Sequence, residues 1–230
     1  MFQDRLTPLY NALKNRFDIR CTGLENIDPE KNYVFMMNHQ SIADVPIAFS
    51  LFVPMTNTKI NLLLSNKFYD FLWPLALPLG VIRVSMDKKS KKAHEYNRRQ
   101  LEKGVRRLRN GGSVLVYPEG TINGGFSNKI LHAETGAIRL ALRAKVPIIP
   151  IGIRNSNKAY PFLLKTKNPF TIKPGHIIYV GVGKEIDLKE YCNLNLNKYS
   201  ESNRQAVRHL TDKIMAKVAK LSGLQQNFPN

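Results

Sequence analysis

Cysteine is scarce in this chain, and its scarcity excludes several kinds of site. The 230 residues include two cysteines, Cys21 and Cys192, which lie far apart and form no CxxC pair. A structural zinc site or a disulfide framework needs more of these ligands at close spacing. The five histidines show no HExxH or similar spacing either, so we expect no metal. Two isolated cysteines are typical of reduced thiols in a cytoplasmic setting.

Long hydrophobic runs are also missing. No apolar run reaches the roughly 20 residues that a bilayer-spanning helix needs. The best candidate, residues 71–82, is short and contains Pro74 and Pro78. We therefore expect no transmembrane helix. The first residues do not resemble a secretory leader, because charged residues such as Asp4 and Lys14 interrupt the apolar positions.

Acidic residues are few compared with basic ones. The chain has 35 Lys and Arg against 17 Asp and Glu, a net charge of +18. So large an excess favours a negatively charged partner: nucleic acid, an anionic membrane surface, or phosphorylated thioester carriers. We expect no nucleic acid, because the chain lacks an RRM-like aromatic block, zinc ligands and a recognisable helix-turn-helix. Residues 88–109 alone hold ten basic residues against Glu95 and Glu102, on a predicted helix with one apolar stripe.

The N-terminal residues 1–18 have the pattern of an amphipathic helix. Apolar residues recur at three- and four-residue steps, with basic residues between them. Such a helix can lie in a membrane interface, and it can equally dock on its own domain. We expect a peripheral or monotopic protein on the cytoplasmic side of a membrane. The apolar positions are Phe2, Leu6, Leu9, Tyr10, Leu13 and Phe17.

The rest of the chain, residues 19–230, predicts one α/β domain: a mixed, mostly parallel central sheet flanked by helices. The reason is that short apolar runs alternate with helical patterns. The expected strands are residues 19–22, 34–37, 60–65, 81–85, 114–117, 148–153, 170–173 and 177–182, the last two forming an antiparallel hairpin. The expected helices are residues 3–17, 42–52, 67–72, 91–110, 135–144 and 201–221.

The segment Asn38-His39-Gln40-Ser41-Ile42-Ala43-Asp44 follows a predicted strand and opens a predicted helix. His39 and Asp44 can meet if His39 precedes the helix and Asp44 reaches back from its first turn. A carboxylate on one ring nitrogen would fix the tautomer and leave the other nitrogen as a base. The alternative is structural: Ser41 and Asp44 have the spacing of a capping box, in which Asp44 holds backbone donors.

A second polar segment, Tyr117-Pro118-Glu119-Gly120-Thr121, follows the strand at 114–117. Ligands gather at the carboxyl ends of strands in α/β sheets. Glu119 offers an acceptor for hydroxyl groups, Gly120 lets the backbone approach a ligand, and Thr121 supplies a hydroxyl. An ordinary Pro-Glu-Gly turn is the alternative. Two such segments at strand ends are more informative than either alone.

Together these segments resemble the 1-acylglycerol-3-phosphate acyltransferase family of glycerolipid acyltransferases. NHQSIAD is similar to its NHxxxxD block and YPEGT to its FPEGT block, while residues 80–82 and 146–151 are similar to the second and fourth blocks. The resemblance covers residues 23–187. It implies that His39 is the general base and Asp44 its orienting partner. It further implies substrate-binding roles for Asn38, Arg83, Glu119, Gly120 and Thr121.

The resemblance also implies the reaction. The donor would be a fatty acyl thioester of coenzyme A or acyl-carrier protein, and the favoured acceptor a lysolipid, 1-acylglycerol 3-phosphate, which yields phosphatidic acid. A thioester is already activated, so a base and an oxyanion-stabilising site are sufficient without a cofactor. The sequence is consistent with such a reaction, since it has no GxSxG nucleophile elbow.

The sequence departs from the family at two positions. The arginines expected after FPEGT and at the end of the second block are Ile122 and Met86 here. Such arginines are expected to hold the acceptor phosphate. Arg83, with Lys88 and Lys89, could take their place. Three alternatives stay open: a lysolipid or hydroxyl lipid with another head group, a lipid-binding protein without turnover, and a nucleic-acid-binding protein.

Overall fold

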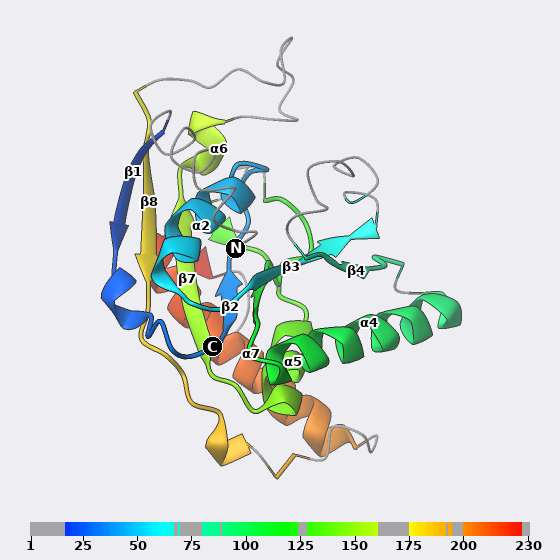
Figure 1. The fold of residues 1–230 in the computed structure, drawn as a ribbon. Coiled ribbons are helices and arrows are strands. Elements are labelled where there is room, and N and C mark those ends of the chain that lie inside the picture. The colour runs from blue at the N-terminus through cyan, green and yellow to red at the C-terminus, as the bar shows by residue number, and fades with distance from the viewer. Residues whose placement is uncertain are drawn as a thin grey trace.

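Seven strands form one sheet in the order β1-β8-β7-β2-β5-β3-β4 (Figure 1). This computed structural model describes residues 17–66, 69, 80–87, 89–123, 128–160, 175–191, 193–194 and 200–226. Neighbouring strands pair in parallel, except β7 with β8. The expected mixed, mostly parallel sheet is therefore confirmed. The strands are β1 (Asp18–Thr22), β2 (Val34–Met37), β3 (Ile60–Ser65), β4 (Ile82–Val84), β5 (Ser113–Val116), β7 (Ile148–Arg154) and β8 (Ile177–Val182).

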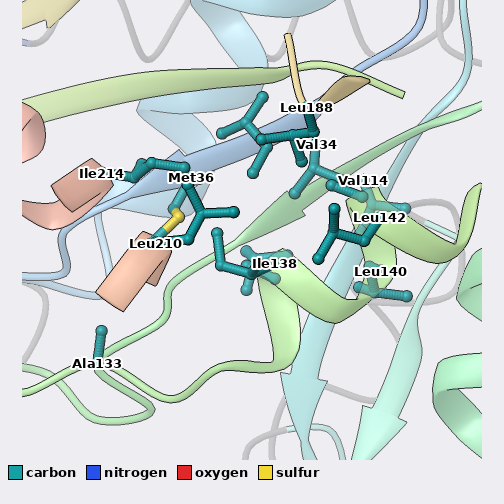
Figure 2. Close-up of a cluster of buried hydrophobic side chains, with 14 of the residues drawn as sticks. Val34, Met36, Val114, Ala133, Ile138, Leu140, Leu142, Leu188, Leu210 and Ile214 are labelled. Carbon is teal, nitrogen blue, oxygen red and sulfur yellow. The ribbon is translucent and has the colours of Figure 1, made fainter. Parts of the chain in front are cut away.

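Helices cover both faces of this sheet. Successive side chains of a strand point to opposite faces, so Val34 and Met36 of β2 belong to one core and Phe35 and Met37 to the other. Helices α4, α5 and α7 pack on the first core, part of which Figure 2 shows, and α2 packs on the second. Burial on both faces explains why β2 is an uninterrupted apolar run. The helices are α2 (Asp44–Phe52), α4 (Lys91–Arg109), α5 (Gly136–Ala144), α6 (Ser156–Ala159) and α7 (Glu201–Ser222).

Helix α4 has the amphipathic character expected of residues 91–110. Ser90 caps its N-terminus by accepting a hydrogen bond from the Ala93 backbone N–H. Ala93, Val105 and Leu108 are buried. Most of the Lys and Arg residues of the helix are exposed. The helix therefore attaches to the domain by its apolar stripe and presents a basic face to solvent.

Several short elements were not expected from the sequence. Strand β6 (Lys129–Ile130) pairs in parallel with β9 (Gln225–Gln226), which ties the segment after the second polar loop to the chain that follows α7. Helix α6 and the single 3-10 turns η2 (Leu24–Asn26), η3 (Val53–Met55) and η5 (Lys189–Tyr191) are likewise too short to leave a periodic pattern.

Three expected elements lie outside the described residues, wholly or nearly so: the N-terminal helix at 3–17, the helix at 67–72 and the strand at 170–173. The strand expected at 177–182 is β8, and its two neighbours in the sheet are β1 and β7. In the part of the chain that the structure describes, no helix combines the length and the apolar character that crossing a membrane requires.

Candidate active site

The two polar segments lie side by side because their strands are neighbours. Strands β2 and β5 pair in parallel with Met36 opposite Val116. His39 is three residues beyond Met36, and Glu119 is three residues beyond Val116. The register therefore brings both side chains to the same carboxyl end of the sheet, as expected for a site in an α/β protein.

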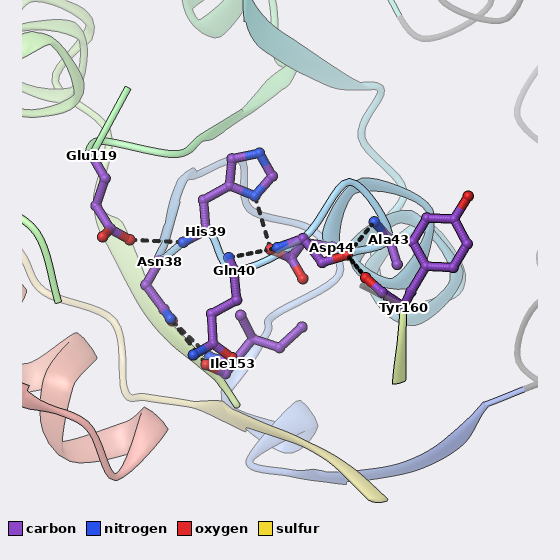
Figure 3. A network of polar contacts seen from close by, with 9 residues as sticks. Asn38, His39, Gln40, Ala43, Asp44, Glu119, Ile153 and Tyr160 are labelled. Atoms are coloured by element: carbon purple, nitrogen blue, oxygen red, sulfur yellow. Dashed lines mark hydrogen bonds and ion pairs between the residues drawn. The ribbon is translucent and has the colours of Figure 1, made fainter. Parts of the chain in front are cut away.

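His39 and Asp44 form a hydrogen-bonded pair. His39 Nδ1 lies 2.8 Å from Asp44 Oδ2, and the Asp44 side chain is completely buried. Asp44 is the first residue of α2, where a carboxylate is favoured by the helix dipole, and it reaches back to the preceding loop. Because a carboxylate only accepts hydrogen bonds, it places the proton on Nδ1 and leaves Nε2 with its lone pair. Figure 3 shows Nε2 on the far side of the ring from Asp44.

Asp44 also holds the backbone of the loop. Its Oδ2 accepts hydrogen bonds from the backbone N–H groups of Gln40 and Ser41, at 2.6 and 2.8 Å. The bond from Ser41 is one half of the predicted capping box. The other half does not form, because Ala43 and not Ser41 directly precedes the helix, and the Asp44 N–H donates to the Ser41 backbone carbonyl. The Ser41 hydroxyl accepts from the Ala43 N–H and donates to the Tyr160 carbonyl. One carboxylate thus orients the imidazole and fixes the loop.

The backbone of His39 is bonded at both of its polar groups. Its N–H donates to Glu119 Oε1 at 2.8 Å, and its carbonyl accepts from the Asn123 N–H at 2.7 Å. Within the described part of the chain, Nε2 is the one polar atom of His39 without a hydrogen-bond partner. The side chain is 14% exposed. The residue is therefore rigidly held, with a single basic atom left for a substrate.

The carboxylate of Glu119 joins its own loop to two other segments of the chain by hydrogen bonds. While Oε1 accepts from His39, Oε2 accepts from the Leu131 backbone N–H at 2.8 Å. The residue is 7% exposed, and burial raises the pKa of Glu119 to about 7 against the lowering effect of these two bonds, with the charge of Asp44 adding to the rise. Each of its oxygens already accepts from a backbone amide, and the expected contact of Glu119 with a substrate hydroxyl stays a prediction.

Tyr117 belongs to the site, although the sequence predicts no role for it there. Its ring stacks on the His39 imidazole, with centroids 4.1 Å apart and planes 24° from parallel. Burial, together with the charge of Asp44, raises the pKa of the Tyr117 hydroxyl well above its ordinary value, so the phenol stays neutral. The feature of the sequence that could have indicated this role is the position of Tyr117, immediately before Pro118 at the end of a strand.

Asn38 is bonded to the backbone of the neighbouring strand β7. It is buried, its Nδ2 donates to the Ile153 carbonyl at 2.9 Å, and its Oδ1 accepts from the Ile153 N–H at 2.7 Å. Both ends of the side-chain amide are therefore occupied by the backbone of β7. In this geometry Asn38 positions the loop, and its expected contact with substrate stays a prediction.

The remaining candidates are Gly120 and Thr121, in the second loop, and Arg83, on strand β4. Gly120 has a left-handed backbone with φ of +68°, and a Cβ there would come within 2.9 Å of Met86 Cε. Thr121 is exposed beside it. Met86, where the family would have an arginine, is thus next to this loop and is 39% exposed. Arg83 is exposed on the edge strand β4, with its guanidinium over the Tyr69 ring at 4.7 Å.

Comparisons with known proteins show which family the chain resembles. Residues 18–154, more than half of the chain, match the Acyltransferase family. The 1-acyl-sn-glycerol-3-phosphate acyltransferase of Borreliella burgdorferi is 28% identical over 202 residues, which cover 87% of this chain and 71% of that protein. The protein of the same name from Saccharomyces cerevisiae is 29% identical over 142 residues, 61% of this chain and 44% of that protein.

The fold has a solved counterpart. The crystal structure of the 1-acyl-sn-glycerophosphate (LPA) acyltransferase PlsC from Thermotoga maritima superposes with a TM-score of 0.62 at 18% identity, over 96% of this chain and 78% of that one. At this identity the likeness concerns the fold alone. Together with the family match, it leads to one conclusion: the chain belongs to the acyltransferase family.

Proposed function

We propose that this chain transfers a fatty acyl group from an acyl thioester to the free hydroxyl of 1-acylglycerol 3-phosphate, which gives phosphatidic acid. The observation that carries the proposal is the His39–Asp44 pair, held at 2.8 Å with Nε2 free beside the Glu119-Gly120-Thr121 loop. The names of the relatives support the choice of acceptor.

The proposed chemistry follows from this arrangement. His39 Nε2 takes the proton of the acceptor hydroxyl while the hydroxyl oxygen attacks the thioester carbonyl carbon. The tetrahedral intermediate then collapses, the C–S bond breaks, and the imidazolium returns the proton to the departing thiolate. Asp44 keeps the imidazole in the required tautomer and stabilises the imidazolium. The sequence of steps needs neither a covalent acyl-enzyme nor a cofactor.

We assign the acceptor to the side of the site formed by the Gly120–Thr121 loop and β4. Thr121 is exposed there and offers a hydroxyl, and the exposed guanidinium of Arg83 offers a cation for a polar head group. Asn38 and Glu119 support this surface by holding the loops in place.

The exposed basic face of α4 supports two further parts of the proposal. It suits a donor that carries phosphate, either acyl-CoA or acyl-carrier protein, and it suits peripheral binding to an anionic membrane surface on the cytoplasmic side. Both interactions are electrostatic, so they should weaken as the salt concentration rises. The exposed residues are Lys91, Lys92, Arg98, Arg99, Lys103, Arg106 and Arg109.

The test is acyl transfer from a labelled acyl thioester to a panel of lysolipids in anionic vesicles. His39→Gln should lower the rate by a factor on the order of 10²–10⁴. His209→Ala, on the exposed side of α7, is the matched control and should leave the rate unchanged. A wild type that binds vesicles and donor but forms no product on any acceptor would instead indicate a non-catalytic lipid-binding protein.

A further inference from the structure

A polar pocket lies between the loop that carries His39 and the end of strand β7. It has a volume of about 400 Å³. Its walls come from four segments: this loop, the residue before β6, the junction of β7 with α6, and the chain that follows α7. The lining residues are Gln40, Asn128, Arg154, Asn155, Asn157, Lys158, Gly223, Leu224 and Gln225.

The composition of the lining favours an anion. Two of the residues, Arg154 and Lys158, are cations, and none of the described lining residues is a carboxylate. Five carry side-chain amides, which can donate N–H groups to oxygen atoms. A pocket with this lining presents positive charge and many donors to a small anionic group.

Arg154 is available for such a group. Its guanidinium lies over the Tyr179 ring at 4.8 Å, and its buried Nε has no hydrogen-bond partner among the described residues. Gly223 permits this position, because a Cβ there would come within 2.9 Å of Arg154 Nη1. An arginine with a buried donor that is not used by the protein is suited to a phosphate oxygen.

Gln40 contributes a polar side chain to the pocket. It is 4% exposed, and its Oε1 is buried without a partner in the described part of the chain. Because Oε1 is an acceptor, it would pair with a hydroxyl or N–H group of the bound substrate, while the amide N–H groups would donate to the phosphate oxygens. Gln40 follows His39 directly, and its side chain leaves the loop on the side of Ile153, away from the imidazole (Figure 3). A ligand bound there would leave the space in front of His39 Nε2 open for a hydroxyl.

We propose that this pocket binds a phosphate group of one of the two substrates, with Arg154 and Lys158 as its cationic ligands and the Gln40 amide as a polar contact. The identity of the group as a substrate phosphate rests on the proposed function. If the bound group is the acceptor phosphate, this pocket takes the place of Arg83 as the head-group site and explains how the chain can do without arginines at Met86 and Ile122. The phosphate has two possible sources, the head group of the lysolipid acceptor and the phosphopantetheine part of the donor.

The first experiment measures binding directly and does not depend on catalysis. Glycerol 3-phosphate and coenzyme A are titrated calorimetrically into wild type, Arg154→Gln, Lys158→Gln and Arg20→Gln, the last an exposed control on β1. For one of the two ligands, Arg154→Gln should weaken binding about 10- to 100-fold, since it removes charge-assisted hydrogen bonds. Lys158→Gln should weaken it less. Because Lys158 is exposed, this variant tests the pocket even if Arg154→Gln fails to fold.

The second experiment uses turnover to identify the source. If the pocket holds the acceptor phosphate, Arg154→Gln raises KM for 1-acylglycerol 3-phosphate and leaves KM for monoacylglycerol unchanged. If it holds the donor, KM for acyl-CoA rises with every acceptor. Equal binding of both ligands by wild type and both pocket variants would overturn the proposal, even with full activity. A wild type without turnover would refute the proposed function alone and leave the binding result to decide on the pocket.

Discussion

Glu119 and His39 are joined by a hydrogen bond of 2.8 Å from the backbone N–H of His39 to the carboxylate of Glu119. The bond links the loop after β5 to the loop after β2, and the second oxygen of Glu119 holds Leu131. A buried carboxylate that binds two backbone amides in this way controls the position of the base.

The charge of Glu119 should make stability depend on pH. Its pKa is about 7 in the folded chain against an ordinary value of 4.5, so the folded state binds the proton more tightly. Stability should therefore fall as the pH rises from about 4.5 to about 7, and by about 3 kcal/mol in total for this group. In Glu119→Gln this contribution is absent. Denaturant unfolding of both proteins at several pH values measures it, and a constant difference across this window would contradict the raised pKa.

Asp44→Asn should reduce activity strongly while the fold persists. An asparagine can still accept a backbone hydrogen bond, but it neither fixes the Nδ1–H tautomer nor stabilises the imidazolium. We expect a loss in kcat on the order of 10²–10⁴. Asp18→Asn on the edge strand β1 is the control, since its side chain is exposed. An unchanged kcat in Asp44→Asn would remove Asp44 from the mechanism.

Asn38→Ala should destabilise the protein more than it weakens substrate binding. The change leaves the N–H and carbonyl of Ile153 buried without their partners, at a cost of about 2–4 kcal/mol. Thermal or denaturant unfolding measures this cost, and steady-state kinetics measures KM. A higher KM with unchanged stability would instead support the direct substrate contact that the sequence suggested.

Gly120→Ala tests the second loop. The left-handed backbone disfavours any side chain by about 1–2 kcal/mol, and the new Cβ would also push against the end of Met86. We expect lower stability and lower activity. In the double variant Gly120→Ala/Met86→Ala, the stability lost through the contact with Met86 should be restored. The stability lost through the left-handed backbone should remain lost. A double variant no better than Gly120→Ala would show that backbone strain dominates, and Met86→Ala alone is the control.

Much of the fold could be predicted from the sequence, because its central elements have strong local patterns. Strands β2, β3 and β8 and helix α4 lie where the apolar runs and the helical stripe predicted them, within one residue at each end. The neighbours of each strand could not be predicted. Nothing in the pattern of residues 177–182 indicates that β8 lies between β1 and β7, since pairing depends on contacts between distant parts of the chain.

The site was predictable where chemistry and spacing coincide. His39 and Asp44 were expected to meet, and they do so with Asp44 at the start of α2, as that expectation required. The positioning roles of Asn38 and Glu119 were harder to predict. Their hydrogen bonds go to the backbone of Ile153 and Leu131, and backbone groups are the same whatever the residue type. The pocket around Arg154 was missed for a similar reason: its walls come from four separate segments of the chain.

The pairing of β2 with β5 has a consequence for how such a chain can change in length. His39 and Glu119 are 80 residues apart in sequence, yet each lies three residues past a paired position in the sheet. Inserting or deleting one residue between Met36 and His39, or between Val116 and Glu119, would break the hydrogen bond between His39 and Glu119. The connection between the two strands, which includes β3, β4 and α4, can lengthen or shorten without moving either residue. The hydrogen bond between His39 and Glu119 therefore constrains the lengths of two short loops and leaves the long connection between their strands unconstrained.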